Sequence, residues 1–127
     1  MSFIPGGNNW YLALMLFSTE VKAAGALELE VSFTLIYAAG PEEAYNAAMK
    51  IGHEREVSFT NTDDQVVDVK YHGLKDLNVI LDPLENGAEI AFEVIPDIES
   101  DEIAKQVSRK EDLGVFKPTI FDRPGSR

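Results

Sequence analysis

The segment LELEVSFTLIY, residues 27–37, alternates between apolar and polar residues over most of its length. A period of two is typical of a β-strand, because successive strand side chains point to opposite faces of a sheet. We expect a half-buried strand whose apolar side faces the core and whose other side faces water. The apolar side comprises Leu27, Leu29, Val31, Phe33, Leu35 and Tyr37, and the polar side comprises Glu28, Glu30, Ser32 and Thr34.

The run before it carries apolar residues on both parities from Trp10 to Phe17. Such a run indicates a strand that is covered on both faces and therefore central in a sheet, although a helix can also be written through it. The link VKAAGA contains small residues and Gly25. We therefore predict an antiparallel hairpin with a somewhat long loop.

A helix is predicted to begin at Pro41, because proline is favoured at the first helical position and Glu42 and Glu43 place negative charge at the positive end of the helix dipole. Its sheet-facing stripe has helical spacing and small side chains, namely Ala44, Ala47, Ala48 and Ile51. Gly52 is expected to cap the helix C-terminus. His53 would then be the first residue beyond the cap, and Glu54 would lead into the next strand.

The second half of the chain reads as further antiparallel sheet. Residues 55–61 and 65–74 form a predicted hairpin around the turn at 62–64, AEIAFEVIP at 88–96 is a predicted last strand, and a short helix follows from Ser100. The predicted fold class is α+β: a mainly antiparallel sheet of about five strands, ordered β-β-α-β-β-β, with one main helix on one face and a short C-terminal helix. We divide the chain into an N-terminal arm (1–9), one domain (10–112) and a C-terminal tail (113–127).

Charge narrows the range of partners. The chain has 22 acidic and 11 basic residues and a net charge of −11, so its surface should repel phosphate backbones and nucleic-acid binding is not expected. Residues 1–104 carry 19 acids and 5 bases, a net of −14, whereas residues 105–127 carry 3 acids and 6 bases, a net of +3. Cysteine is absent, and no signal sequence or run of 18 apolar residues is seen. We expect a soluble cytoplasmic protein that does not enter a membrane.

Few residues are candidates for a ligand-binding, metal-binding or catalytic site. A pocket between helix and sheet could use the polar groups of Tyr45, His53, Tyr71 and His72, although aromatic residues on core parities are more often core. The two histidines, with Glu54 or Asp68, could also form a two-His-one-carboxylate set, but their spacing matches no recognised zinc motif. We predict no metal, no cofactor and no catalytic residue.

The C-terminal tail has two apolar pairs, from which Phe116, Ile120 and Phe121 are selected as interaction residues. A disordered tail is usually poor in such side chains. One interpretation is a solvated tail whose basic residues only offset the negative charge of the acidic body nearby. The other, which we prefer, is a tail that docks on an acidic face of its own chain or of a second subunit, and it leads us to expect a homodimer.

Several motifs together resemble a bacterial family catalogued only as a domain of unknown function. They are Trp10-Tyr11-x-Ala13, the helix start Glu42-Glu43-Ala44-Tyr45, the step Gly-Leu-x-Asp-Leu at 73–77 and the turn Asn86-Gly87-x-Glu89. The resemblance covers Trp10 to about Ile95. It implies a small α+β domain of unassigned role, and it implies no reaction, cofactor or catalytic residue.

Two hypotheses of function follow. The first is a non-catalytic acidic binding or interaction module, inhibitor-like or immunity-like toward a basic protein partner. The alternative is a small enzyme or ligand-binding protein with a pocket between helix and sheet. A closed pocket lined by both histidines and a desolvated carboxylate would favour the alternative, and a filled core would favour the module.

Overall fold

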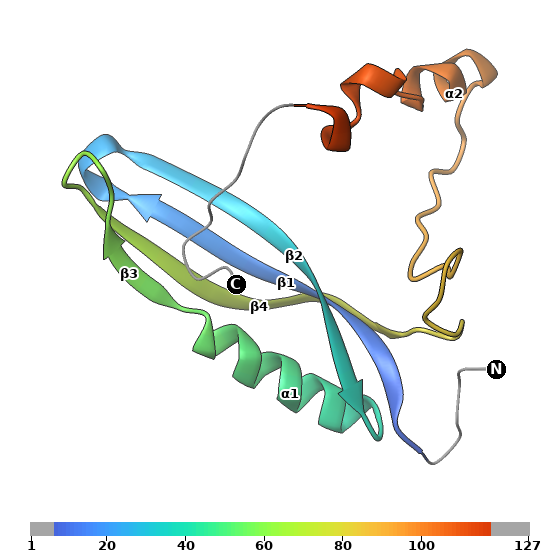
Figure 1. Ribbon diagram of the computed structural model, residues 1–127, viewed down its shortest axis with the longest axis horizontal. Helices are drawn as coiled ribbons and strands as arrows, with labels where there is room; N and C mark the ends of the chain where they lie inside the picture. The colour runs from blue at the N-terminus through green and yellow to red at the C-terminus, as the bar shows by residue number, and fades with distance from the viewer. Residues whose placement is uncertain (1–6, 118–127) are drawn as a thin grey trace. The chain divides into compact units, whose positions relative to one another are not determined.

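A computed structural model describes residues 7–117 of the 127-residue chain. The chain divides into two compact units at Ala91/Phe92. The first unit is a four-stranded antiparallel sheet in the order β2-β1-β4-β3, with helix α1 beside it (Figure 1). Its elements are β1 (Asn9–Val21), the 3-10 turn η1 (Lys22–Ala24), β2 (Ala26–Ala38), α1 (Pro41–Glu54), β3 (Val57–Thr60) and β4 (Val66–Val79).

The β1–β2 hairpin is confirmed as the centre of the fold. The two 13-residue strands pair along their whole length, from Asn9 opposite Ala38 to Val21 opposite Ala26. Gly25 ends the connecting turn with a φ of 65°, a left-handed conformation that glycine adopts without steric cost. Because β1 also pairs with β4, it is a central strand, as its two apolar parities predict.

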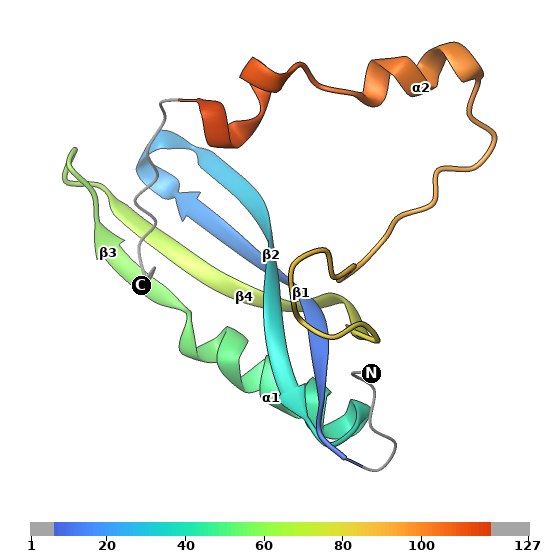
Figure 2. The ribbon, with the colours of Figure 1, turned by 45° about the vertical axis from the view of Figure 1, so that its right-hand side comes forward.

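The hairpin of β3 and β4 is also confirmed, with Val57 opposite Val69 and Phe59 opposite Val67. Asn61 closes its turn, because its side-chain oxygen accepts the backbone N–H groups of Asp63 and Gln65, each at 2.9 Å. Figure 2 shows the twist of the long strands β1, β2 and β4.

Strand β4 continues to Val79, beyond the predicted strand at residues 65–74. Gly73 lies inside the strand with a φ of 129°. Beside it the register against β1 shifts twice, because Phe17 faces Tyr71 while Leu16 faces Gly73, and Met15 faces Leu74 while Leu14 faces Asp76. Each shift is a β-bulge that inserts one residue into β4. The bulges keep the apolar residues of β4, Tyr71, Leu74, Leu77 and Val79, on one face although their spacing departs from two.

That face carries the core, which α1 covers. The predicted alanine stripe is confirmed, since Ala44 and Ala48 are fully buried and Ala47 and Ile51 pack beside them. Sheet residues Ala13 and Ala38 are also buried, and their small side chains let the helix approach the sheet closely. The buried cluster consists of Tyr11, Ala13, Met15, Phe17, Ile36, Ala38, Ala44, Ala48 and Tyr71.

The expected burial of β2 is wrong, although its alternation is confirmed. Leu27, Leu29 and Phe33 are 68%, 67% and 65% exposed, whereas Ile36 and Ala38 of the opposite parity are buried. The reason is the position of α1, which lies on the face that holds Ala13 and Ala38. The apolar parity of β2 therefore points to the side of the sheet without the helix.

Two further predictions require correction. The sheet has four strands rather than about five, because residues 80–99, including AEIAFEVIP, contain no strand and pair with neither sheet edge. Alternation marks a segment that can pair, but a strand also needs a partner backbone. Gly52 is not the helix cap, since α1 continues through His53 to Glu54 and its C-cap is Arg55.

The second unit, in its described part, holds the helix α2 (Ser100–Gln106) and the 3-10 turns η2 (Lys110–Asp112) and η3 (Gly114–Phe116). The predicted short C-terminal helix is thus confirmed. Glu99 and Glu102 form a capping box at its start, in which each side chain accepts the other residue's backbone N–H. None of the residues of α2, η2 and η3 is buried.

Candidate functional site

The side of the sheet opposite α1 presents a continuous apolar surface along β1 and β2. The register places Trp10 opposite Tyr37, Leu14 opposite Phe33 and Leu16 opposite Val31. Side chains of directly opposed residues lie on the same face, so the two strands form a double row. We call this surface the open face, and it comprises Trp10, Leu12, Leu14, Leu16, Leu27, Leu29, Val31, Phe33, Leu35 and Tyr37.

Exposure varies along the open face. Leu12 is buried, while Leu14, Leu16 and Val31 are half-buried. The other six side chains are exposed, and the most exposed lie toward the η1 end of β2. At the other end, the rings of Trp10 and Tyr37 pack at a tilt with their centroids 4.8 Å apart. A row of large apolar groups left in water is the least expected feature of the first unit.

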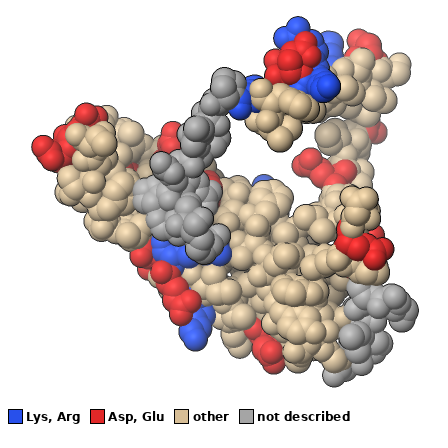
Figure 3. All heavy atoms as spheres, viewed as in Figure 1, with Lys and Arg blue, Asp and Glu red and all other residues tan. Residues whose placement is uncertain are grey.

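Charge is nearly absent from the open face. Among the twelve positions that β1 and β2 present on this side, Glu20 alone is charged. The neighbouring strand β4 contributes polar groups instead, because Asp68, Lys70 and Asp76 pair with Glu20, Ser18 and Leu14. Figure 3 shows acidic side chains at the tip and along the edges of the visible side of the first unit. The open face is therefore an apolar strip with a polar border.

Strand β2 is also an edge strand of the described sheet. Thirteen residues are long for an edge strand with an apolar side, since natural edge strands are usually short, charged or covered. Both the face and the edge of β2 thus have the properties of a surface that pairs with another protein surface.

The predicted pocket between helix and sheet is a packed contact around Tyr71. The ring of His53 meets the Tyr71 ring edge-on at a centroid distance of 5.2 Å, and the Tyr71 hydroxyl donates to the sulfur of Met49 at 3.3 Å. Gly52 lies against the face of the same ring, so closely that a Cβ there would overlap it. His53, Met49 and Gly52 of α1 thus all contact the Tyr71 side chain.

Electrostatics around Tyr71 follow from these contacts. Burial raises the pKa of the Tyr71 phenol, and the charge of ionised Tyr45 raises it further. Glu56 accepts the backbone N–H of Tyr71 at 3.0 Å, and this bond lowers the pKa of the Glu56 carboxyl, with desolvation acting in the opposite direction. His53 adds to the lowering, its Nδ1 being 3.5 Å from a Glu56 oxygen.

Of the four predicted ligand-binding residues, Tyr45, His53 and Tyr71 therefore gather on the helix side of the sheet. His72 lies on the opposite side, where its Nε2 and the Ser18 hydroxyl are 2.7 Å apart. The sequence alone does not predict the contact with Ser18, because the bulge at His72 determines on which side of the sheet the imidazole lies. A serine and a histidine alone are not a nucleophilic site, which also needs an orienting group and oxyanion donors.

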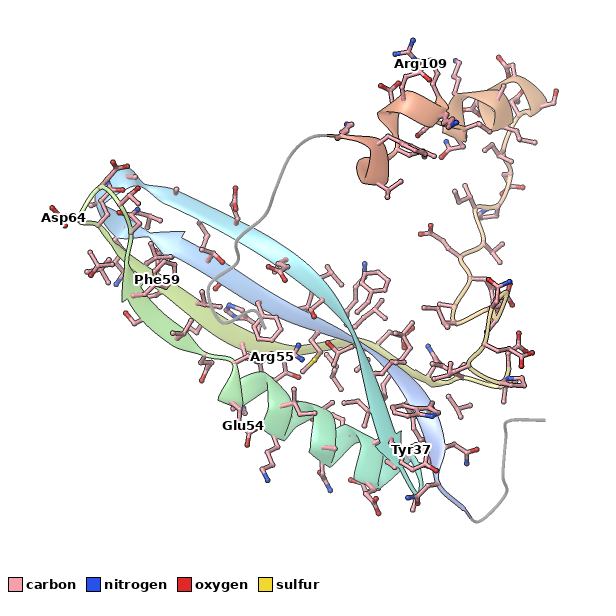
Figure 4. All side chains as sticks on the ribbon, in the orientation of Figure 1. Tyr37, Glu54, Arg55, Phe59, Asp64 and Arg109 are labelled. Atoms are coloured by element: carbon pink, nitrogen blue, oxygen red, sulfur yellow. The ribbon has the colours of Figure 1, made fainter. Side chains whose placement is uncertain are left out.

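Arg55 and Glu54 show how the helix ends against the sheet. In Figure 4 Glu54 points away from the sheet and Arg55 points toward it. The Arg55 guanidinium donates to the Thr34 hydroxyl at 3.1 Å, which ties the helix terminus to β2. Thr34 belongs to the polar alternate positions of β2, so these positions face the helix side of the sheet. They therefore do not form the solvent-facing side that the sequence predicts.

Other candidate sites fall outside this surface. Within residues 7–117, no group of three or more His, Asp or Glu side chains could hold a metal ion. Phe116 is 54% exposed in η3 with Lys110 Nζ 5.4 Å from its ring centre, and its role in interaction stays a prediction. Ile120 and Phe121 lie outside the described residues.

No helix among the described residues is long and apolar enough to cross a membrane.

Comparison with known families identifies the first unit. Residues 10–92 match the family model described as Domain of unknown function (DUF4288). The chain belongs to this family. The DUF4288 match includes the whole open face and all four strands except Asn9, the first residue of β1, and it ends at the boundary with the second unit. No curated protein and no solved structure matches the chain.

Proposed function

We propose that this DUF4288 chain is a non-catalytic interaction module that binds another protein through the open face. The observation that carries the proposal is the row of six exposed large apolar side chains on β1 and β2. Monomeric proteins rarely expose contiguous apolar patches of more than a few hundred square ångströms unless the patch binds something. A bound protein would cover this surface and stabilise the bound state by removing apolar area from water.

The surroundings of the open face suit a protein partner. Interfaces between proteins combine an apolar centre, rich in aromatic side chains, with a polar rim. Here Trp10, Phe33 and Tyr37 supply the aromatic groups and β4 supplies the rim. The acidic body would favour approach of a basic partner at a distance, as an inhibitor-like or immunity-like module requires, while the open face would make the contact. The absence of cysteine suits a reducing compartment such as the cytoplasm.

The alternative, a small enzyme or ligand-binding protein, has less support. It would use Tyr45, His53 and Tyr71 between helix and sheet, but Gly52 and the Tyr71 ring are already in contact there. Ligand sites in proteins are usually concave cavities that are largely formed in advance.

Site-specific photo-crosslinking tests the proposal. A photoreactive amino acid at Phe33 or Leu29, in the full chain within its host cell, should give covalent protein adducts of discrete mass. The matched controls carry the same group at Lys50 or Glu54, exposed positions of α1, and should give none. Equal labelling from α1, or no adduct from either open-face position, would contradict an interaction through this surface.

A further inference from the structure

We infer that the partner of the open face is a second copy of this chain, and that two copies pack their open faces together about a two-fold axis. The inference rests on the proposed interaction through the open face, and it names a second copy of the chain as the partner in place of a basic protein. In such an isologous interface each copy contributes the same surface, so the surface must be complementary to itself.

Charge is the first support for a second copy. Two chains of net charge −11 repel each other, and an isologous contact is possible only through a surface on which like charges do not meet. The open face meets this condition, because Glu20 is the one charged residue that β1 and β2 present there. A basic partner would form almost no ion pairs with the open face, because the open face carries almost no acidic side chains.

The available area is the second support. A large aromatic side chain buries roughly 150–250 Å². The three aromatic side chains of the open face are 39–65% exposed and so offer roughly 300 Å² of surface, and the three exposed leucines add further apolar area. Standard protein interfaces bury about 800 Å² on each partner, and the half-buried Leu14, Leu16 and Val31 add to the area that the open face can contribute. The strip is thus of the size that a stable dimer needs.

Sheet geometry is the third support. Two sheets pack face to face about 10 Å apart when their inner faces carry apolar side chains at every second residue. In the first unit α1 covers one face, so the sheet can form only one such contact, and the open face has the required alternation along both of its strands. The dimer would place the two sheets inside and the two α1 helices outside.

The chain carries its own reporter for this contact, because its one tryptophan is Trp10 on the open face. Light scattering of the full chain over a range of concentrations should give twice the 14.1 kDa chain mass, falling to 14.1 kDa on dilution. The emission of Trp10 should move to longer wavelength with the same midpoint, as water reaches the indole. A chain that stays at 14.1 kDa at all concentrations would overturn the inference.

Two matched variants locate the interface. Phe33→Asp places a charge in the centre of the open face and should leave 14.1 kDa at concentrations where the wild type is a dimer. Phe92→Asp makes the same change at a 79% exposed phenylalanine of the second unit and should keep the dimer. Leu29→Ser, with a milder change, should weaken the dimer at least tenfold, and circular dichroism checks that each variant is folded. A dimer that survives Phe33→Asp, or is lost in Phe92→Asp, would overturn face-to-face packing.

The outcomes also separate this inference from the proposed function. A monomer in which Trp10 is shielded at every concentration would mean that the same chain covers the open face. A monomer with an exposed Trp10 that still gives a foreign adduct from Phe33 in the crosslinking experiment would refute the second copy and retain the interaction module. A monomer without adducts would refute both.

Discussion

The ring of Tyr71 lies against the backbone of Gly52, so that any side chain at position 52 would overlap it. Tyr71 comes from the bulged part of β4 and Gly52 from the last turn of α1, and this contact therefore fixes how the C-terminal half of the helix lies on the sheet. The same ring contacts Phe17 and His53. Gly52 is thus a packing residue inside the helix.

The first prediction concerns Gly52→Ala. In an exposed helix this change stabilises by about 1 kcal/mol. Here we expect a loss of about 1–3 kcal/mol in the free energy of unfolding, because the new Cβ must displace the Tyr71 ring. Urea unfolding measures the difference. In a Tyr71→Ala background, which removes the ring, Gly52→Ala should become neutral or stabilising. An unchanged sign in the two backgrounds would show that the contact does not govern this position.

Ala48→Asp tests the packing of α1 on the sheet. Ala48 is fully buried between helix and sheet, and a carboxylate there would lack a partner. We expect destabilisation of about 3 kcal/mol or more, seen as a lower melting temperature. Asn46→Asp is the matched control, because Asn46 is exposed on the same helix and should tolerate the charge. Similar melting of the two variants would contradict the position of the helix.

Much of the fold is predictable from the sequence because its signals are local. Alternation at 27–37 predicts β2, and Pro41 with the alanine stripe predicts α1. Which side of β2 is buried cannot be predicted from β2 alone. It depends on which sheet face carries the small alanine side chains that the helix packs against, and Ala13 lies on a different strand from Ala38. The bulges in β4 and the failure of residues 88–96 to form a strand likewise depend on which strands are available for pairing. The open face could not be predicted, since its apolar residues read as core.

A third prediction concerns acid. The pKa of Glu56 is lowered in the folded state, mainly because its carboxylate accepts the Tyr71 N–H. A group with a lowered folded pKa stabilises the fold above its unfolded pKa, and this stabilisation is lost as the pH falls through the folded pKa. Glu56→Gln should therefore reduce stability near pH 7 and have a smaller effect at acid pH. Urea midpoints at several pH values measure it.

The control for this experiment is Glu54→Gln, two residues earlier, whose side chain points away from the sheet (Figure 4). Its effect on the urea midpoint should be small at each pH. A Glu56→Gln effect that does not change with pH, or that equals the effect of the control, would show that the bond to Tyr71 does not couple ionisation to folding.

The fourth prediction is that the histidines are dispensable for the fold. His53 contributes an edge contact to Tyr71 and His72 a hydrogen bond to Ser18, both at exposed positions. The double variant His53→Gln/His72→Gln should lose no more than about 1–2 kcal/mol, from one aromatic contact and one hydrogen bond. Metal analysis of the purified wild-type protein provides the second measurement. Stoichiometric zinc or nickel that the double variant lacks would contradict this prediction and revive a metal site.

The last prediction concerns a chain that ends at Phe92, where the DUF4288 match ends. Every residue of the buried cluster lies between Tyr11 and Tyr71, and its packed neighbours end at Val79. The shortened chain should therefore unfold cooperatively, with a melting temperature close to that of the full chain, and should form the same dimer through the open face. Thermal melts and light scattering compare the two. A non-cooperative melt or a lost dimer would mean that the C-terminal segment with Phe116 adds to the fold or the interface, as the tail-docking prediction requires.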